Sequence, residues 1–334
     1  MNVLLVGGTG LISTGITRQL VAAGHDVTCF TRGRTTAELP ESVAFVRGDR
    51  DDRDALERAR DRVDPDCVID MVCFDPEQAA AAVEAFDGVD RYVFCSTVDV
   101  YHRPLPTNPV AEDAPTTPPV SDYGADKAAC ERVFAAADGD AFDVTTIRPW
   151  STYGEGGPVL HTFGSGTYYL DRLREGEPVV VHGDGASLWG PCHRDGVAAA
   201  FVAAVETPAA RGETYHVTSE EVITWNQYHR VVADALGAPE PELVHIPTDV
   251  LLEAVPERTQ GLRDHFRFST VFDNTKARRD LNFEQTVPFR DGVARSIAHL
   301  EATDRIDPWD SENDDAIVEA WRTAREGFVA DVGP

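Results

Sequence analysis

Tyr123 and Lys127 are the two residues whose types and spacing best suit catalysis. They stand four positions apart, so a helix would place them on one face, about 5–6 Å apart at Cβ. An ammonium about 4 Å from a phenol, at an effective dielectric near 20, favours the phenolate by about 4 kcal/mol, or roughly three pKa units. Such a tyrosine can act as a general acid or base near neutral pH. A chance pair on a solvated helix is the alternative, but Lys127 and Lys276 are the only lysines in the sequence.

Thr97 is a further candidate for chemistry. It follows an apolar run at 91–96 that predicts a strand, within Cys95-Ser96-Thr97-Val98-Asp99-Val100-Tyr101. Ligands of open parallel sheets bind beyond the carboxyl ends of the strands, where a hydroxyl can hydrogen-bond a substrate oxygen. A hydroxyl residue that only caps the strand end is an equally good local interpretation.

A glycine-rich turn at the start of the chain predicts a dinucleotide site. The apolar run 2–6 breaks at Gly7-Gly8-Thr9-Gly10, and apolar residues then recur at helical spacing. The glycines let the backbone turn sharply and approach a phosphate, and the helix directs its free N–H groups at a pyrophosphate. The pattern is Gly7-x-x-Gly10-x-x-Ser13, with a small serine as the third member. Glycine also serves tight turns for geometry alone, but the flanking strand and helix favour the dinucleotide.

These residues require elements to position them, and the first half of the chain alternates strand and helix patterns. Strands are predicted at 2–6, 26–30, 43–47, 66–72, 91–96 and 143–149, and helices at 11–23, 53–61, 77–86 and 121–137. This alternation is typical of a parallel, doubly wound sheet. We therefore predict an α/β fold with a dinucleotide-binding domain at 1–155. A smaller α/β substrate part is expected at 156–334, and some of its segments could return to the first domain.

The rest of the chain is less regular. The segment 103–119 contains six prolines and is predicted to be a loop that shapes the site. Further strands are predicted at 178–182 and 214–218, and helices at 195–206, 225–236 and 288–301. In the acidic tail 303–334, the side chains Ile317, Trp321, Ala324 and Phe328 form one apolar stripe. We interpret this stripe as a docked terminal helix rather than a partner site.

The charge is strongly one-sided. Acidic residues number 57 against 30 basic ones, a formal net charge of -27, and they are scattered along the whole chain. A scattered acidic excess indicates a solvated surface that repels nucleic acid and anionic membranes. Near 1 M salt the Debye length is about 3 Å, so this self-repulsion would largely disappear. We expect a protein of a salt-loving organism, with no nucleic-acid or membrane partner; an ordinary acidic protein is the alternative.

The cysteines and the N-terminus indicate a cytoplasmic location. The six cysteines show no CxxC or Cys/His metal spacing, and most lie in or beside apolar runs. We therefore expect buried, reduced thiols and no metal site. No apolar run approaches the ~18 residues of a membrane span. The chain enters a predicted strand at once, and we read no signal peptide.

Together these motifs resemble the extended short-chain dehydrogenase/reductases, the group of NAD-dependent epimerases and dehydratases. Residues 7–13 resemble the cofactor loop, and 96–101 resemble the segment Ser-Ser/Thr-x-x-Val-Tyr-Gly, with His102 in place of the glycine. The pair Tyr123 and Lys127 resembles the catalytic pair, and 148–154 resemble Arg-Pro-x-x-x-Tyr-Gly. Residues 193–195 and 272–276 resemble two characteristic segments of the family's substrate domain. The resemblance covers most of the chain and implies a Rossmann-type fold.

The resemblance also implies roles for individual residues. Thr97 would orient the substrate, Tyr123 would move the hydroxyl proton, and Lys127 would lower the tyrosine pKa and hold the nicotinamide ribose. Asp49 would contact the adenine. Substrate contacts are expected near Asp99, Tyr101, Trp150, His161 and His193, although a structural role is an equal alternative for each histidine. The expected cofactor contacts are Gly7, Thr9, Gly10, Leu11, Ile12, Arg32, Arg34, Asp49, Arg50, Met71, Val72, Tyr123, Lys127 and Pro149.

The expected cofactor is NADP or NAD, with NADP slightly favoured. An NAD-specific site usually has an acid at the end of the second strand. The sequence there is Phe30-Thr31-Arg32-Gly33-Arg34, and Arg32 or Arg34 could pair with a 2′-phosphate. Solvated arginines beside a bound NAD are the alternative.

The resemblance predicts hydride transfer at a sugar or nucleotide-sugar alcohol, as an epimerase or a dehydrogenase/reductase. Family dehydratases carry an aspartate and a glutamate where this chain has Val98 and Asp99, so loss of water is not expected. A cofactor-bound, non-catalytic binding or regulatory protein is the alternative. A homodimer through the predicted helices at 77–86 and 121–137 is a further expectation.

Overall fold

The computed structural model describes residues 1–35, 37–117, 119, 121–309 and 311–333. Pro118 of the proline-rich segment, and Asp310 and Pro334 of the tail, lie outside the described residues. The chain divides into two compact units. The first contains residues 1–152, 190–221 and 271–287, and the second contains 153–189, 222–270 and 288–334.

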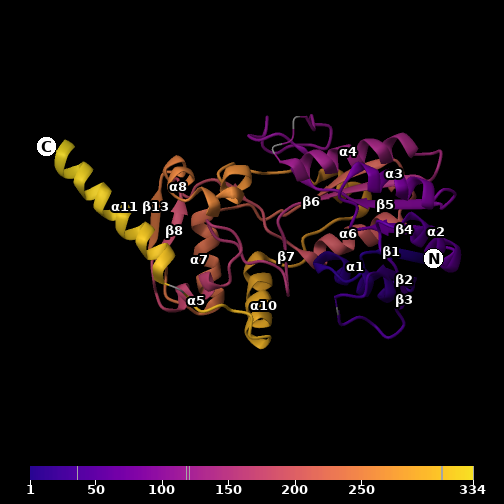
Figure 1. Cartoon of the computed structure of the whole chain (residues 1–334), viewed down its shortest axis with the longest axis horizontal. Helices are drawn as coiled ribbons and strands as arrows, with labels where there is room; N and C mark the ends of the chain where they lie inside the picture. The colour runs from indigo at the N-terminus through magenta and orange to yellow at the C-terminus, as the bar shows by residue number, and fades with distance from the viewer. Residues whose placement is uncertain (36, 118, 120, 310, 334) are drawn as a thin grey trace. The chain divides into compact units, whose positions relative to one another are not determined.

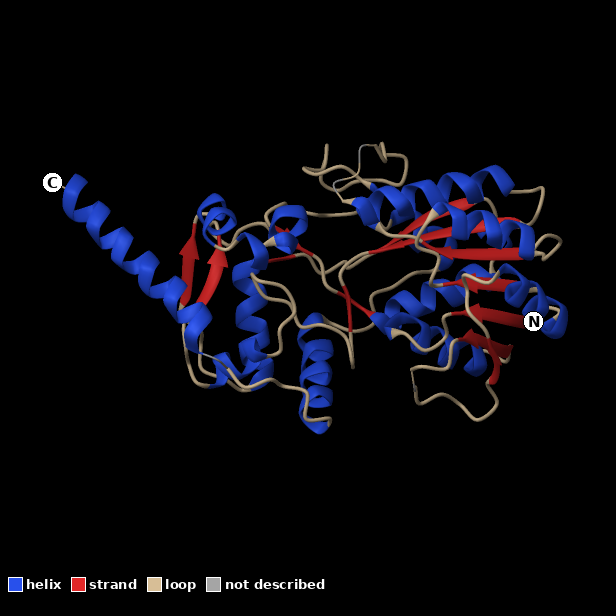
Figure 2. Ribbon diagram, viewed as in Figure 1, coloured by secondary structure: helices blue, strands red, loops and turns tan. Residues whose placement is uncertain are grey.

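The first unit is built on one seven-stranded parallel sheet (Figures 1 and 2). The strand order is β11-β6-β5-β4-β1-β2-β3, so the chain runs outward from β1 in both directions, as in a doubly wound sheet. The strands are β1 (Asn2–Val6), β2 (Asp26–Thr31), β3 (Ala44–Arg47), β4 (Cys67–Asp70), β5 (Arg91–Cys95), β6 (Asp143–Pro149) and β11 (Glu213–Val217). The fold is Rossmann-type α/β, as predicted.

Helices cover both faces of this sheet because its strands are apolar on both sides. In β1, Val3 and Leu5 are buried in one apolar cluster, and Leu4 and Val6 in the other. The first cluster contains side chains of α1 (Leu11–Ala22), α6 (Arg194–Glu206) and α9 (Thr275–Leu281). The second contains side chains of α2 (Arg53–Val63), α3 (Pro76–Ala85) and α4 (Asp122–Ala137). This unit also contains the short elements η1 (Val98–Val100), β10 (Cys192–His193) and η2 (Pro208–Ala210).

The predicted elements of the first half all occur, with shifts of only a few residues at their ends. The strand predicted at 66–72 ends at Asp70. The Asp70 carboxylate accepts a hydrogen bond from the Val72 backbone N–H at 3.0 Å. This local turn takes the chain out of the sheet, and Met71 and Val72 line the cavity described below.

The second unit combines helices with two short strand pairs. The pair of β8 (Val179–His182) and β13 (Leu243–Ile246) is parallel, and the pair of β9 (Leu188–Trp189) and β12 (Ile223–Thr224) is antiparallel. Its helices are α5 (Tyr168–Arg174), α7 (Trp225–Leu236), α8 (Thr248–Ala254), η3 (Pro256–Arg258), η4 (Leu262–Phe266), α10 (Phe289–Ala302) and α11 (Ser311–Val332). The two-residue strand β7 (Thr152–Tyr153) spans the boundary between the units.

The terminal helix α11 is only partly docked. Val318 is buried, but Phe328 keeps 67% of its surface exposed, and Val329 and Val332 are exposed as well. The expectation of a docked stripe as far as Phe328 is therefore wrong for the second half of the helix. No helix in the described part of the chain is long and apolar enough to cross a membrane.

Candidate active site

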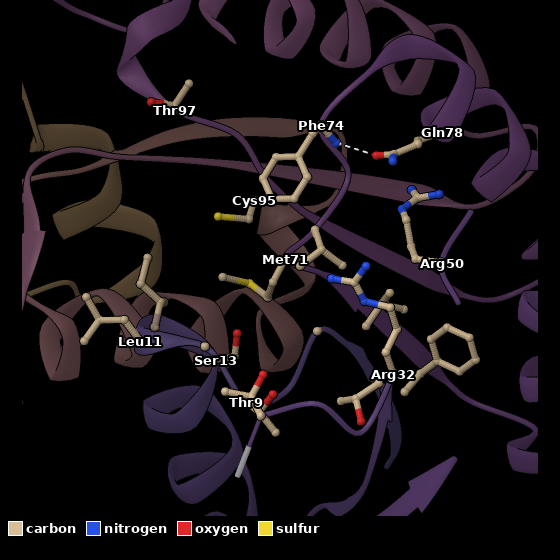
Figure 3. Close-up of a pocket in the computed structure, with 18 of the residues that line it drawn as sticks. Thr9, Leu11, Ser13, Arg32, Arg50, Met71, Phe74, Gln78, Cys95 and Thr97 are labelled. Carbon is tan, nitrogen blue, oxygen red and sulfur yellow. Dashed lines mark hydrogen bonds between the residues drawn. The ribbon is translucent and has the colours of Figure 1, made fainter. Parts of the chain in front are cut away.

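A cavity of about 700 Å³ lies in the first unit, and it is lined by the segments that follow β1 to β6. Its volume is in the usual range for a small-molecule or cofactor site. Figure 3 shows the glycine turn with Thr9, Leu11 and Ser13, the arginines Arg32 and Arg50, and the labelled side chains Met71, Phe74, Cys95 and Thr97. Every residue predicted to contact the cofactor lines this cavity, as do Thr97, Asp99 and Trp150.

The glycine turn has the geometry that a pyrophosphate requires. Gly7 has φ +88° and donates its N–H to the Phe30 carbonyl at 3.0 Å. A Cβ at Gly7 would lie only 2.6 Å from Val72 Cγ1, so the position excludes a side chain. Gly10 is the N-cap of the twelve-residue helix α1, and neither a side-chain cap nor a first-turn acid occupies the amino end of this helix. This free, positively polarised helix end fits a dinucleotide.

Two arginines and two carboxylates lie along the adenine side of the predicted cofactor site. Arg32 and Arg34 are exposed in the segment after β2, and both line the cavity. Asp49 and Asp51 line it from the segment after β3. Arg50, between them, is buried and forms an ion pair with Asp70.

Thr97 and Tyr123 lie next to each other because two short structures meet at the end of β5. The Thr97 hydroxyl caps η1 by accepting the Asp99 N–H at 3.2 Å, and Tyr123 stands in the first turn of α4. A Cβ at Gly124 would lie only 2.1 Å from the Asp99 carbonyl oxygen. The close approach that glycine permits therefore fixes the start of α4 against η1. The Thr97 side chain interacts with the Tyr123 phenol and by itself lowers the phenol pKa.

Lys127 lies one turn further along α4 and is buried, with 1% of its surface exposed. Its ammonium donates hydrogen bonds to the carbonyl oxygens of Cys95 and Cys73, at 2.7 and 2.8 Å. It also lies 4.9 Å from the centroid of the Phe74 ring, which faces the cavity. Two of its three N–H donors therefore hold the segment after β4 to the end of β5. The third has no hydrogen-bond partner among the described residues and can serve a ligand.

The Tyr123 pKa departs from the sequence-based expectation. Burial of the phenol raises this pKa above its usual value, although 44% of the residue's surface is exposed, and the nearby Asp99 carboxylate raises it further. Lys127 is not among the main causes of this shift; its ammonium is directed at two backbone carbonyl oxygens and lies 5.9 Å from the centroid of the Tyr123 ring. At neutral pH the phenol is protonated and can donate a proton.

Asp99 and Trp150 border the reactive end of the cavity and share a buried neighbour, Arg103. The Arg103 guanidinium lies 3.5 Å from the Asp99 carboxylate and 5.5 Å from the centroid of the Trp150 ring. It also donates to the carbonyl oxygens of Val98 and Tyr101. Arg103 therefore positions both cavity-lining side chains.

Three predicted substrate residues do not line the cavity. The Tyr101 hydroxyl is buried and bonded to His216 Nε2 at 2.7 Å and to Arg148. His193 is buried and caps α6, accepting the Asp195 N–H at 3.2 Å. His161 belongs to the second unit, where burial lowers its pKa to about 3 and its ring stacks on Tyr169. Each side chain has structural partners within the described part of the chain, and the substrate contacts expected of these three residues stay predictions.

Phe74, Gln78 and Cys95 also line the cavity, and sequence reasoning did not assign them to the site. The Phe74 N–H donates to Gln78 Oε1 at 2.7 Å (Figure 3), and Gln78 Nε2 donates to Asp51 at 2.7 Å. Phe74 and Gln78 follow the unexpectedly early end of β4, which gave no separate signal in the sequence. No group of three or more His, Cys, Asp or Glu side chains among the described residues is arranged to hold a metal ion.

Comparison with known proteins decides the family. A sequence model of the NAD dependent epimerase/dehydratase family matches residues 3–218. The chain belongs to this family. It is an NAD-dependent oxidoreductase or epimerase of the extended short-chain dehydrogenase/reductase type.

The proteins that are similar to this chain bear names of different functions. The 2'-dehydrokanamycin reductase of Streptomyces kanamyceticus is 35% identical over 82% of this chain and 77% of its own. The chloroplast stem-loop binding protein of 41 kDa b from Arabidopsis thaliana is 27% identical over 73% of this chain and 65% of its own. The UDP-glucose 4-epimerase of Thermus thermophilus, solved in complex with NAD, has a TM-score of 0.70 at 21% identity and covers 90% of this chain and 99% of its own. This last likeness concerns the fold.

Proposed function

We propose that the protein transfers hydride reversibly between a nicotinamide dinucleotide and a secondary alcohol or ketone of a sugar-type ring, using Thr97, Tyr123 and Lys127. The observation that carries this proposal is that all three residues and the glycine turn line one cavity. A bound cofactor would supply the hydride. The glycine turn and α1 would hold its pyrophosphate, and the free N–H of Lys127 would hold its nicotinamide ribose.

The protonation state of Tyr123 favours the direction of reduction. A phenol whose pKa is raised by burial keeps its proton at neutral pH and can deliver it to the oxygen of a ketone as the carbon is reduced. Thr97 would hold the same oxygen. The relative that is 35% identical bears the name of a reductase, which agrees with this direction. Epimerisation would use the same residues in both directions.

Elimination of water is not part of the proposal. In family dehydratases two carboxylates serve this step, and here one of their positions is Val98, whose buried isopropyl group cannot transfer a proton. Asp99 is held beside Arg103. Thr97, Tyr123 and Lys127 suffice for the transfer of a proton and a hydride at one carbon of the substrate.

We propose NADP as the preferred cofactor. Arg32 and Arg34 are exposed, line the cavity, and form no ion pair with a carboxylate in the described part of the chain. Two such guanidinium groups suit the 2′-phosphate of NADP. Titration of the protein with NADPH and NADH would test this, and NADH binding tenfold tighter would contradict it.

A nucleic-acid-binding role is the second candidate because one relative is named as a stem-loop binding protein. The net charge of -27 opposes such a role. Measurements of turnover separate the two candidates. Reduction is tested by following the nicotinamide absorbance of NADPH in the presence of 2'-dehydrokanamycin. Epimerisation is tested by incubating the protein with UDP-glucose and NAD and analysing the products. Conversion that requires Tyr123 supports the enzyme, whereas no conversion together with RNA stem-loop binding at physiological salt would support the second candidate.

A further inference from the structure

Two of the six cysteines form a thiol pair behind the wall of the cavity. Cys73 Sγ donates a hydrogen bond to Cys130 Sγ at 3.9 Å, and both side chains are buried. Cys73 follows the end of β4, and Cys130 lies on α4. The sulfurs of the other four cysteines contact backbone carbonyl oxygens or, for Cys29, the Thr17 hydroxyl. The sulfur atoms of Cys73 and Cys130 are therefore already in contact, as disulfide formation requires.

This pair adjoins the residues proposed to hold the cofactor. The Cys73 carbonyl oxygen accepts the Lys127 ammonium at 2.8 Å. Cys130 lies less than one turn beyond Lys127 on α4. Val72 and Phe74, the sequence neighbours of Cys73, both line the cavity. A displacement of Cys73 would therefore move both the cavity wall and a hydrogen-bond partner of Lys127.

The surroundings of the two thiols suit them to different steps of an oxidation. The hydrogen bond from Cys73 and the charge of Lys127 lower the pKa of the Cys130 thiol, and the pKa of the Cys73 thiol is raised. A thiolate attacks a peroxide, and a neighbouring thiol then resolves the sulfenic acid. Phe74 keeps 47% of its surface exposed, so a small movement of the segment after β4 opens the pair to a small oxidant.

We propose that Cys73 and Cys130 are a redox-sensitive pair, which a hydroperoxide converts to a disulfide that weakens cofactor binding. The Cys130 thiolate attacks one oxygen of hydrogen peroxide, the O–O bond breaks, and a sulfenic acid and hydroxide form. The hydroxide takes up the proton that Cys130 released and becomes water. The Cys73 sulfur then displaces the sulfenic oxygen, which leaves with the Cys73 proton as a second water. Two thiols are thereby oxidised, and one hydrogen peroxide is reduced to two waters.

The disulfide should act on the cavity through the segment after β4. A disulfide bond is about 2.05 Å long, so the two sulfurs must approach from 3.9 Å. This approach draws Cys73 toward α4 and shifts Val72 and Phe74 in the cavity wall. A thiol reductant reverses the change. The inference rests on the proposed function only in that a nicotinamide dinucleotide binds in this cavity.

The test treats the purified protein with hydrogen peroxide and measures two properties without turnover. Peptide mapping without a reductant detects the Cys73–Cys130 linkage, and calorimetry measures the affinity for NADPH before oxidation, after it, and after addition of dithiothreitol. The variants Cys130→Ser and Cys130→Ala remove the attacking sulfur and differ in polarity, so that one can replace the other if it folds poorly. Cys192→Ala, at another buried cysteine, is the matched control.

The wild-type protein and the Cys192→Ala control should form the linked peptide and bind NADPH at least tenfold more weakly, and dithiothreitol should restore the affinity. The Cys130 variants should keep their NADPH affinity after the same treatment. Absence of the linked peptide in the treated wild-type protein would overturn the inference, and so would unchanged NADPH affinity of the fully linked protein. If the reduced wild-type protein bound neither NADPH nor NADH, the proposed function itself would be overturned, whether or not the linkage formed.

Discussion

Lys127 and Tyr123 share one face of α4, yet the Lys127 ammonium lies 5.9 Å from the centroid of the Tyr123 ring. It is bonded to the carbonyl oxygens of Cys73 and Cys95 instead. The lysine therefore joins the ends of two strands, and the phenol keeps a raised pKa. In this arrangement the tyrosine is an acid at neutral pH.

The pH dependence of the reaction should follow from this raised pKa. Reduction uses the protonated phenol, so its rate should stay level through neutral pH and fall only under alkaline conditions. Oxidation uses the phenolate, so its rate should rise steadily with pH over the same range. Asp99→Asn removes a negative neighbour that raises the pKa and should move the oxidation profile to lower pH. Asp51→Asn serves as the control. An oxidation rate that already reaches its plateau near pH 7 in the wild-type enzyme would contradict the assignment.

Gly124 should tolerate no side chain. In Gly124→Ala the new Cβ would lie 2.1 Å from the Asp99 carbonyl oxygen, and the start of α4 would have to shift. We expect a loss of about 1–3 kcal/mol in the free energy of unfolding, with a large fall in activity, measured by denaturant titration and turnover. Gly327→Ala is the matched control in α11, where a Cβ meets nothing within 4 Å. Equal stability of the two variants would show that α4 and η1 are not locked at this contact.

The Tyr101 hydroxyl should contribute to the stability of the fold and not to cofactor affinity. Tyr101→Phe leaves the ring in place but removes the hydroxyl that bonds His216 and Arg148. Leaving these buried partners unsatisfied should cost about 1–3 kcal/mol, while NADPH affinity should stay unchanged. Tyr123→Phe makes the same chemical change at a half-exposed position and should leave stability nearly unaltered. A Tyr101→Phe protein as stable as the wild type, but weak in substrate binding, would restore the contact expected from the sequence.

Salt should stabilise the protein. A net charge of -27 produces self-repulsion in dilute buffer, and screening shortens the Debye length to about 3 Å at 1 M. The melting temperature should rise between ~0.1 M and ~2 M potassium chloride. A flat profile would contradict the proposed adaptation to high salt.

The sequence was sufficient to predict the sheet because its strands are short apolar runs bounded by clear turn residues. Val3 to Val6 fill both faces of the sheet, and this two-sided burial is visible as an unbroken apolar run. The lining of the cavity was also predictable in part, since the glycine turn and the residues at the ends of β2, β3 and β6 that were expected to contact a cofactor all line it.

The substrate residues were less predictable because proximity in sequence does not determine where a side chain lies. Tyr101 is two residues from Asp99, but only Asp99 lines the cavity, whereas the Tyr101 hydroxyl is buried against His216. The raised Tyr123 pKa was not predictable because burial, its largest cause, depends on segments far away in the sequence.

The most direct test compares the wild-type protein with Tyr123→Phe for NADPH binding and for single-turnover reduction of a keto sugar. We expect unchanged NADPH affinity, because the phenol hydroxyl acts on the substrate oxygen. The reduction rate should fall about 10²- to 10⁴-fold, since the proton donor is lost. A Tyr123→Phe protein that reduces the same keto sugar at the wild-type rate would contradict the assignment of Tyr123 as the proton donor.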